Sequence, residues 1–352
     1  MPENNRGQPP ERPDEKTRRN RWLWSFVLFA LVLGFVIYYF SQIKEELRLL
    51  EKLNPWCLAA AIGSQFLTYL FTASVYQVLV KAFRAPALPR LASLLKASIV
   101  SLFFNQTIPS AGISGNTFLF TFLARFNIAK AQIISLILTE LLLFYAAMEA
   151  LIILLLTACL FVYPSLPAFK GTLAAGIAVY AAFALGIYFA GNKEFLRRQY
   201  EKLKKIKVMA RLVERLKKKL PIAMIPPGGI AFPAFIRNEK TAALKVFFLQ
   251  LLITGADALT LQAIILGVGS TASFLIVLIT LVSTRIISIL PFLPGSLVLY
   301  ESSMSFFFVK AGLPLGIAIM ITLVYRLLSF WVPIPIGTIF YRRWLKSGSS
   351  SI

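Results

Sequence analysis

Long apolar runs separated by short polar segments are the dominant pattern of this chain. A helix needs roughly 20 apolar residues to cross the hydrocarbon core of a bilayer. Runs of this kind occur at 22–40, 56–80, 131–162, 170–191, 242–266 and 315–340. The pattern therefore predicts an all-α, polytopic integral membrane protein with about six full membrane spans.

Two further apolar segments, 91–124 and 271–310, are interrupted by proline and glycine. The interruptions read NQTIPSAGISGN at 105–116 and LPFLPGSLVLYE at 290–301. Irregular backbone is tolerated at membrane depth only where protein or a water-filled cavity satisfies its polar groups. One arm of each segment has about 14 residues, or about 21 Å of helix, which is short for a full crossing. We expect two re-entrant helical hairpins; pairs of short full spans, giving eight or more spans in all, are the alternative.

The order of these elements repeats along the chain. The span 56–80, the first hairpin and the span 131–162 are followed by the span 242–266, the second hairpin and the span 315–340. The span 170–191 lies between the two units and reverses the direction in which the second unit starts. This order predicts an inverted-topology repeat, in which paired breaks point to a transport-type binding site.

Basic residues are concentrated in the tails and loops. The chain has 37 Lys and Arg against 15 Asp and Glu, a formal net charge of +22. Because these residues flank apolar runs, we interpret the excess as a signal that sets the orientation of the chain in the membrane and as contact with anionic lipid, rather than as a sign of a nucleic acid partner. The basic segments at 81–96, 192–241 and 342–346 place both termini in the cytoplasm of a plasma-membrane protein. Residues 1–21 are expected to be a disordered, basic cytoplasmic tail, followed by a transmembrane domain at 22–346.

The longest basic loop contains an amphipathic segment at 192–220. Apolar residues recur there every three to four positions, and Lys and Arg fill the other face. We interpret it as a helix lying on the cytoplasmic surface of the membrane. A calmodulin-target or nucleic-acid segment is the weaker interpretation, because the segment is tethered between spans.

The residue types that the chain lacks exclude several kinds of chemistry. It contains no His, which excludes imidazole acid–base catalysis and His metal ligands. Cys57 and Cys159 lie in separate apolar runs without metal-ligand spacing. No loop contains an Asp-rich motif of the DxxD type. We therefore expect neither a metal nor a cofactor.

Ionisable residues inside the apolar segments are candidates for function. Each costs about 2.5–3.5 kcal/mol near the bilayer centre even on a lenient scale, so most should face inward, paired or near water. Arg285 and Glu301 are placed symmetrically about the second break. They either pair with each other and close the hairpin, or leave Glu301 to engage a substrate cation or proton. The whole set comprises Glu140, Glu149, Asp257, Arg285, Glu301 and Arg326.

Helical spacing adds an expectation for the other members of this set. Arg326 has no acidic residue three or four positions away, so its partner should come from another helix or from substrate. Asp257 shares a helix face with Gln250 and Thr254, which we interpret as an interhelical contact. Glu140 and Glu149 are about half a turn out of phase, so at most one of them is expected to serve a common site.

Each break is expected to end where a new half-helix begins, near Ser114–Asn116 and near Ser296, with Ser or Asn as the N-cap. Two helix N-termini would then present free N–H groups and positive dipole ends at mid-membrane. Such ends suit an anion or a phosphate group. Two proline-kinked spans without a ligand are the alternative.

Three motifs carry a family resemblance: IPSAGISGN (108–116), RIISILPFLPGSLVLYE (285–301) and LVYRLLSFWVPIPIGTIFYRR (323–343). Together they resemble the transmembrane region of lysylphosphatidylglycerol synthases, the membrane half of multiple peptide resistance proteins, and its stand-alone flippase-like relatives, over roughly residues 20–345. The resemblance implies a domain with re-entrant hairpins that moves aminoacylated or other phospholipids between leaflets. The positions that match the family motifs are Pro109, Gly112, Gly115, Pro294, Gly295, Glu301 and Arg326.

Two places depart from the family pattern. Ser296, Leu297 and Val298 follow the second Pro-Gly, where more glycine is usual, and Asn116 stands where an acidic residue is common. These departures concern the identity of the substrate rather than the fold.

We therefore predict a phospholipid flippase or related lipid transporter, not an enzyme, with no soluble synthase domain after Ile352. A membrane-embedded enzyme acting on lipid or polyprenyl phosphates, and a scaffold for a separately encoded lipid-modifying enzyme, are the alternatives. Expected partners are phospholipids and the anionic cytoplasmic lipid surface, with a homo-oligomer or a separate lipid-modifying enzyme as further candidates. The candidate substrate-binding residues are Asn105, Pro109, Gly112, Ser114, Gly115, Asn116, Asp257, Arg285, Pro294, Gly295, Ser296, Glu301 and Arg326.

Overall fold

The computed structural model describes residues 53–108, 113–190, 232–289, 296 and 298–348. Several predictions fall outside these residues: the tail 1–21, the apolar run 22–40, the amphipathic segment 192–220, and Pro109, Gly112, Pro294 and Gly295.

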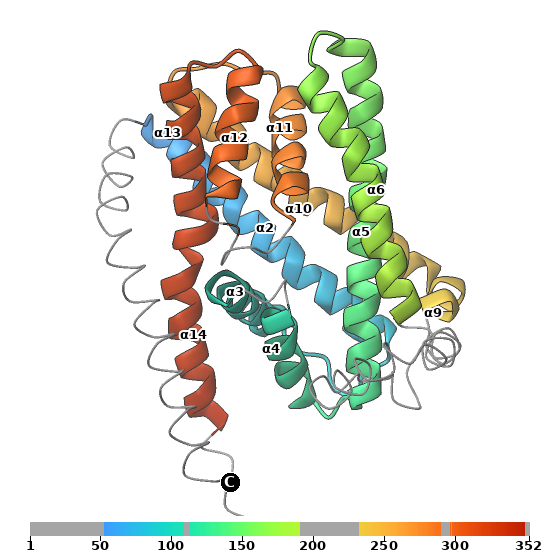
Figure 1. The fold of residues 1–352 in the computed structure, drawn as a ribbon. Coiled ribbons are helices and arrows are strands. Elements are labelled where there is room, and N and C mark those ends of the chain that lie inside the picture. Colours follow the sequence, from blue (N-terminus) through green and yellow to red (C-terminus); the bar gives the residue numbers. More distant parts are fainter. Residues whose placement is uncertain (1–52, 109–112, 191–231, 290–295, 297, 349–352) are drawn as a thin grey trace, which may run out of the picture. The chain divides into compact units, whose positions relative to one another are not determined.

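All regular elements in the described part of the chain are helical (Figure 1). They are α2 (Pro55–Ala82), α3 (Leu91–Thr107), α4 (Ile113–Ala124), α5 (Lys130–Val162), α6 (Pro167–Ala190), α9 (Phe232–Asn238), α10 (Lys240–Gly267), α11 (Phe274–Ile287), α12 (Leu299–Lys310), α13 (Leu315–Arg326), the π-helical turn Leu327–Trp331 and α14 (Pro333–Gly348). Among the described residues, 5 segments are long and apolar enough to cross a membrane: α2, α5, α6, α10 and the continuous run Leu315–Lys346. The predicted spans in this part of the chain, and the all-α membrane fold, are confirmed.

Helices α2 and α10 run antiparallel along their whole length. At one end, the Asn54 N–H donates to the Gly267 carbonyl at 3.1 Å. At the other end, Arg84 lies 3.8 Å from the Glu239 carboxylate. These helices open the two units of the predicted repeat, and their opposite directions are what an inverted repeat requires.

Both broken segments fold into pairs of packed helices, α3 with α4 and α11 with α12. Figure 1 shows the first pair in the lower half of the molecule and the second in the upper half. Gly115 allows close contact in the first pair, because a Cβ atom there would lie 2.5 Å from the Ser101 carbonyl oxygen. The helical arms are confirmed, whereas re-entry into a bilayer stays a prediction.

The run from α13 to α14 is continuous but contains a π-helical turn, in which the Val332 N–H donates to the Leu327 carbonyl at 2.9 Å. Pro333 has no N–H and cannot donate to the Ser329 carbonyl four residues earlier. Gln106 of α3 supplies the missing donor, since its Nε2 lies 2.9 Å from that carbonyl oxygen. The first hairpin is thereby tied to the turn that follows Arg326.

We expect Gln106→Leu to lower the free energy of unfolding by about 1–3 kcal/mol, because the partly buried Ser329 carbonyl would lose its donor. In a Pro333→Ala background the backbone can supply that donor itself, so the same substitution should cost much less. The difference is measured by thermal unfolding in detergent of four proteins: the wild type, the two single variants and the double variant. Equal costs in both backgrounds would contradict the role given to Gln106.

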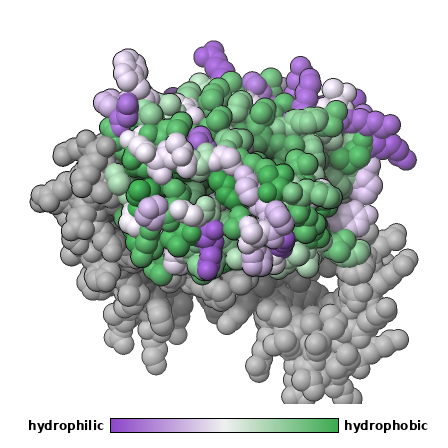
Figure 2. Space-filling model, turned by 90° about the horizontal axis from the view of Figure 1, so that it is seen from above, coloured by the Kyte–Doolittle hydropathy of each residue, from purple (hydrophilic) through white to green (hydrophobic). Residues whose placement is uncertain are grey.

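Buried apolar side chains form separate core clusters on the two hairpins. Phe118 and Leu123 pack in the cluster that joins α3 and α4 to α2, α5 and α14, whereas Val282 and Phe307 pack with α5 and α6. Seen from above, hydrophobic residues dominate the face, and strongly hydrophilic ones are scattered, several of them at its edge (Figure 2). Each hairpin is thus anchored to the long helices by its own core.

Candidate functional site

Among the described residues, two ion pairs lie inside the helix bundle, and the first joins α10 and α11. The Arg285 guanidinium donates to the Asp257 carboxylate, and through Nη1 to the Thr254 hydroxyl at 3.1 Å. Thr68 of α2 donates to the other oxygen of Asp257 at 3.1 Å. Only 7% of the Asp257 side chain is exposed, so both charges are compensated within the protein.

The second ion pair joins α12 and α13. Arg326 Nε donates to Glu301 Oε1 at 2.6 Å. The Arg326 guanidinium also lies over the rings of Tyr300, at 4.6 Å, and Phe330, at 4.3 Å. The Arg326 side chain is 7% exposed and that of Glu301 is 22% exposed. The acid is therefore the more accessible member of the pair.

Tyr300 lies beside the second ion pair. It precedes Glu301 in the first turn of α12, stacks on Tyr325 with ring centroids 6.4 Å apart, and its ring faces the Arg326 guanidinium. We call the set Asp257, Arg285, Tyr300, Glu301 and Arg326 the charged centre. It draws its members from α10, α11, α12 and α13, which all belong to the second unit of the predicted repeat.

Of the two alternatives for Arg285 and Glu301, the pairing of these residues with each other is wrong. Arg285 turns to α10, where Asp257 and Thr254 provide two buried acceptors for its planar donors, and Glu301 turns to α13. Two other expectations are confirmed: Arg326 takes its partner from another helix, and Asp257 makes interhelical contacts.

The two glutamates of α5 do not share a site. Gln250 donates to the Glu140 carboxylate at 2.9 Å, so the same stripe of α10 that carries Asp257 also serves this residue. Glu149 has a buried carboxylate oxygen without a hydrogen-bond partner in the described structure. The prediction that they cannot serve one common site is consistent with these separate surroundings.

At the first break, Asn105 holds the start of α4. Its side-chain oxygen accepts from the Gly115 N–H at 2.8 Å and from the Ser114 hydroxyl at 3.3 Å. Ser114 also contacts the Phe104 carbonyl at 3.0 Å. Asn116 is half-buried in the same turn. The structure thus brings Asn105, Ser114 and Gly115 together, and the contacts among them join α3 to α4.

The expected Ser or Asn N-caps need correction. Helix α4 begins at Ile113, so Ser114 and Asn116 lie within its first turn, and Asn105 of α3 accepts from that turn. Helix α12 has Val298 as its N-cap, with φ 70° and no side-chain cap. The Ser296 hydroxyl donates instead to the Ser288 carbonyl at 2.7 Å and ties the break to the end of α11.

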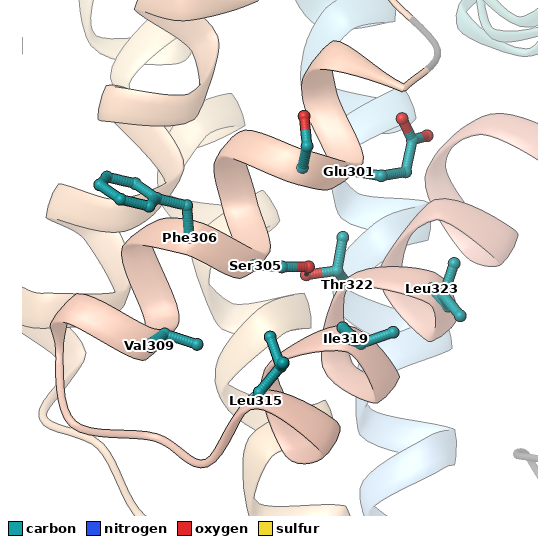
Figure 3. Close-up of a pocket in the computed structure, with 9 residues that line it drawn as sticks. Glu301, Ser305, Phe306, Val309, Leu315, Ile319, Thr322 and Leu323 are labelled. Carbon is teal, nitrogen blue, oxygen red and sulfur yellow. Dashed lines mark hydrogen bonds between the residues drawn. The ribbon is translucent and has the colours of Figure 1, made fainter.

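A groove of about 490 Å³ runs between α12 and α13 and ends at Glu301 (Figure 3). Its walls are mainly apolar, and Leu315 and Ile319 are 61% and 40% exposed. Ser302, Ser305 and Thr322 also line it, but the hydroxyls of Ser305 and Thr322 are buried, and Ser305 donates to Thr322 at 3.2 Å. The groove is therefore an open, almost wholly apolar depression with Glu301 at one end.

No group of three potential metal-ligating side chains (His, Cys, Asp or Glu) occurs among the described residues. Cys57 and Cys159 are both free thiols.

Sequence reasoning missed Tyr300, Phe330 and the groove residues other than Glu301. An aromatic residue beside a membrane-embedded acid could have indicated Tyr300. Phe330 follows Arg326 by four residues, a spacing that places both on one face of a helix, so this contact could also have been found from the sequence. The groove depends on how α12 and α13 pack, which local sequence does not encode.

Comparison with known proteins identifies the family that the three motifs resemble, and the match extends over most of the chain. The sequence pattern of the family described as the lysylphosphatidylglycerol synthase TM region matches residues 22–337. A UPF0104 membrane protein of Pyrococcus horikoshii is 27% identical over 104 residues, which cover 30% of this chain and 31% of that protein. A UPF0104 membrane protein of Methanothermobacter thermautotrophicus is 36% identical over 95 residues, which cover 27% of this chain and 28% of that protein.

These two alignments span less than a third of either relative, whereas the family pattern covers most of the chain. The chain therefore belongs to the lysylphosphatidylglycerol synthase transmembrane-region family of membrane proteins.

Proposed function

We propose that this protein is a lipid transporter, rather than an enzyme, and that it moves a phospholipid between the leaflets of the plasma membrane. One observation carries the assignment: Glu301 belongs both to a partly buried ion pair and to the lining of an apolar groove. A phospholipid has the same combination of properties, with a charged headgroup joined to apolar chains.

The groove is matched to the apolar part of such a ligand. Leu315, Ile319 and Leu323 line it from α13, and Phe306 and Val309 line it from α12. Because Leu315, Ile319 and Phe306 are exposed on the outside of the bundle, an acyl chain could enter sideways from the bilayer. Burial of apolar surface in the groove would then offset the loss of contacts with neighbouring lipid chains.

The charged end is matched to a headgroup. Many phospholipids carry a phosphate, and an aminoacylated phospholipid also carries an ammonium group. Arg326 offers planar donors to a phosphate, and Glu301 offers an acceptor to an ammonium group. A headgroup with both charges could replace each partner of the Glu301–Arg326 pair without leaving a buried charge uncompensated.

The direction of the chain in the membrane is part of the same proposal. The purely basic segment 81–96 and the basic end of α14 support a cytoplasmic location for the C-terminus and for the loop before α3. The uncharged connection between α5 and α6 would then face the other side.

Filling the groove should block transport. We expect Ile319→Trp to lose most of its lipid exchange in reconstituted vesicles that contain a fluorescent phospholipid, measured by dithionite quenching of the outer leaflet. Leu252→Trp on α10 is the matched control, because Leu252 is 50% exposed but lies outside the groove. Equal exchange by both variants and the wild type would overturn the assignment of the groove.

A further inference from the structure

A second cavity, of about 260 Å³, lies where α3, α4 and α14 meet. It is separate from the charged centre and shares no lining residue with the groove at Glu301. The residues that give it its character are Lys96, Phe118, Phe122, Phe340, Arg343 and Trp344. We call it the basic–aromatic pocket.

Three basic segments that are far apart in sequence converge at this pocket. Lys96 comes from α3 and Arg343 from α14. Arg125, just after α4, stacks on the Trp344 ring at 3.6 Å and donates to the Trp344 carbonyl at 3.3 Å. Lys96, Arg125 and Arg343 are all exposed, so their charges are accessible from solvent.

The elements that form the pocket provide no acid to neutralise these charges. The sequence contains no Asp or Glu between Lys81 and Thr139, or between Ser302 and Ile352. The described ion pairs nearest in sequence to these elements use Arg84 and Arg326, and not Lys96 or Arg343. The pocket therefore has a net positive charge to offer to an anion.

Aromatic rings fix the shape of the pocket. Trp344 makes an edge contact with Phe118, with centroids 5.3 Å apart, and stacks on Tyr341 at 5.9 Å. The Lys96 ammonium lies over the Phe340 ring at 6.0 Å. Amphipathic aromatic side chains together with basic residues are typical of the level of lipid headgroups. Basic pockets between membrane helices on the cytoplasmic side bind anionic headgroups.

We propose that the basic–aromatic pocket binds the phosphate-bearing headgroup of an anionic phospholipid from the adjacent leaflet. Its volume suits a headgroup, because pockets that enclose whole drug-sized molecules measure about 300–1,000 Å³. Lys96 and Arg343 hold the phosphate, and the acyl chains stay in the bilayer. The site is additional to the transport path and does not depend on the function of the charged centre.

The test uses Trp344 as a reporter of the bound lipid. The full chain is reconstituted in phosphatidylcholine vesicles with increasing fractions of brominated phosphatidylglycerol. The signal of Trp344 is the difference between wild type and Trp344→Phe, since the chain contains 5 Trp. We expect quenching of Trp344 at a low fraction of the anionic lipid, and a midpoint at least about tenfold higher in Lys96→Gln/Arg343→Gln.

The matched control is Lys130→Gln/Arg342→Gln, which removes the same charge from two exposed residues outside the pocket. A midpoint near the wild-type value in this control supports a specific site. An equal shift in both double variants would show attraction by general surface charge and would overturn the proposal. Equal quenching by brominated phosphatidylcholine, or displacement by millimolar inorganic phosphate, would also overturn it, the latter in favour of a free-phosphate site. Leaflet exchange is measured in parallel, so that a failure here is distinguishable from a failure of the transport assignment.

Discussion

Replacing Asp257 by leucine should lower the free energy of unfolding by about 3–5 kcal/mol, because one partner of a buried ion pair is removed. The Arg285 guanidinium would remain inside the bundle with the Thr254 hydroxyl as its described acceptor, and Thr68 would lose its acceptor. Leucine branches at the same carbon as aspartate and is somewhat larger, so the substitution leaves no cavity. Unfolding of the purified protein in mixed micelles, titrated with a denaturing detergent, measures the change.

The double variant Asp257→Leu/Arg285→Met provides the critical comparison. It buries no charge, so we expect it to recover most of the lost stability. Glu239→Gln is the matched control for removal of an acid from an ion pair. The Arg84–Glu239 pair is long, at 3.8 Å, and its arginine side chain is 88% exposed, so its loss should cost no more than about 1 kcal/mol. A single Asp257→Leu variant as stable as the wild type would contradict the pairing.

The helical framework could be predicted from sequence because the bilayer restricts the choice so strongly. Runs such as 131–162 are too long and too apolar for other elements, and α5 indeed covers Lys130–Val162. The hairpin arms were predictable for the same reason, because Pro and Gly interrupt otherwise apolar helices. The antiparallel course of α2 and α10 also follows from the order of the elements.

The partners of the charged residues could be predicted only in part. The cost of burial indicated that most ionisable residues in the apolar segments face inward, paired or near water, and that the partner of Arg326 comes from another helix or from substrate. Arg326 and Asp257 are both paired within the protein. The symmetric placement of Arg285 and Glu301 about the second break suggested that they could pair with each other. Which helix a side chain faces, however, depends on the rotation of each hairpin helix about its own axis. The predicted N-cap residues were wrong for a similar reason, because the acceptor at the start of α4 is Asn105, which lies on another helix.

Glu301→Gln should reduce lipid exchange roughly ten- to hundredfold while leaving the protein folded, since a hydrogen bond to a charged group contributes about 1.5–3 kcal/mol. The glutamine oxygen can still accept from Arg326 Nε, and Tyr300 and Phe330 still flank the guanidinium. The substitution therefore removes the negative charge at the end of the groove with little change in packing. Arg326→Met removes the opposite charge and should abolish exchange.

Two comparisons separate this effect from a general loss of structure. Glu149→Gln removes a charge from another membrane-embedded acid that lies outside both the groove and the charged centre, and it should retain exchange. Unfolding midpoints of the Glu301 and Glu149 variants should stay close to that of the wild type. Loss of exchange in both variants would indicate that the measurement responds to any change of charge in the bundle.

The most direct measurement of the central claim is the rate of phospholipid exchange between leaflets in vesicles that contain the purified Glu301→Gln variant. A protein in which Glu301 joins the charged centre to the lipid groove should lose most of that rate, although it remains folded and reconstitutes as efficiently as the wild type. Exchange at the wild-type rate by the folded variant would contradict the assignment of this protein as a lipid transporter that works through Glu301.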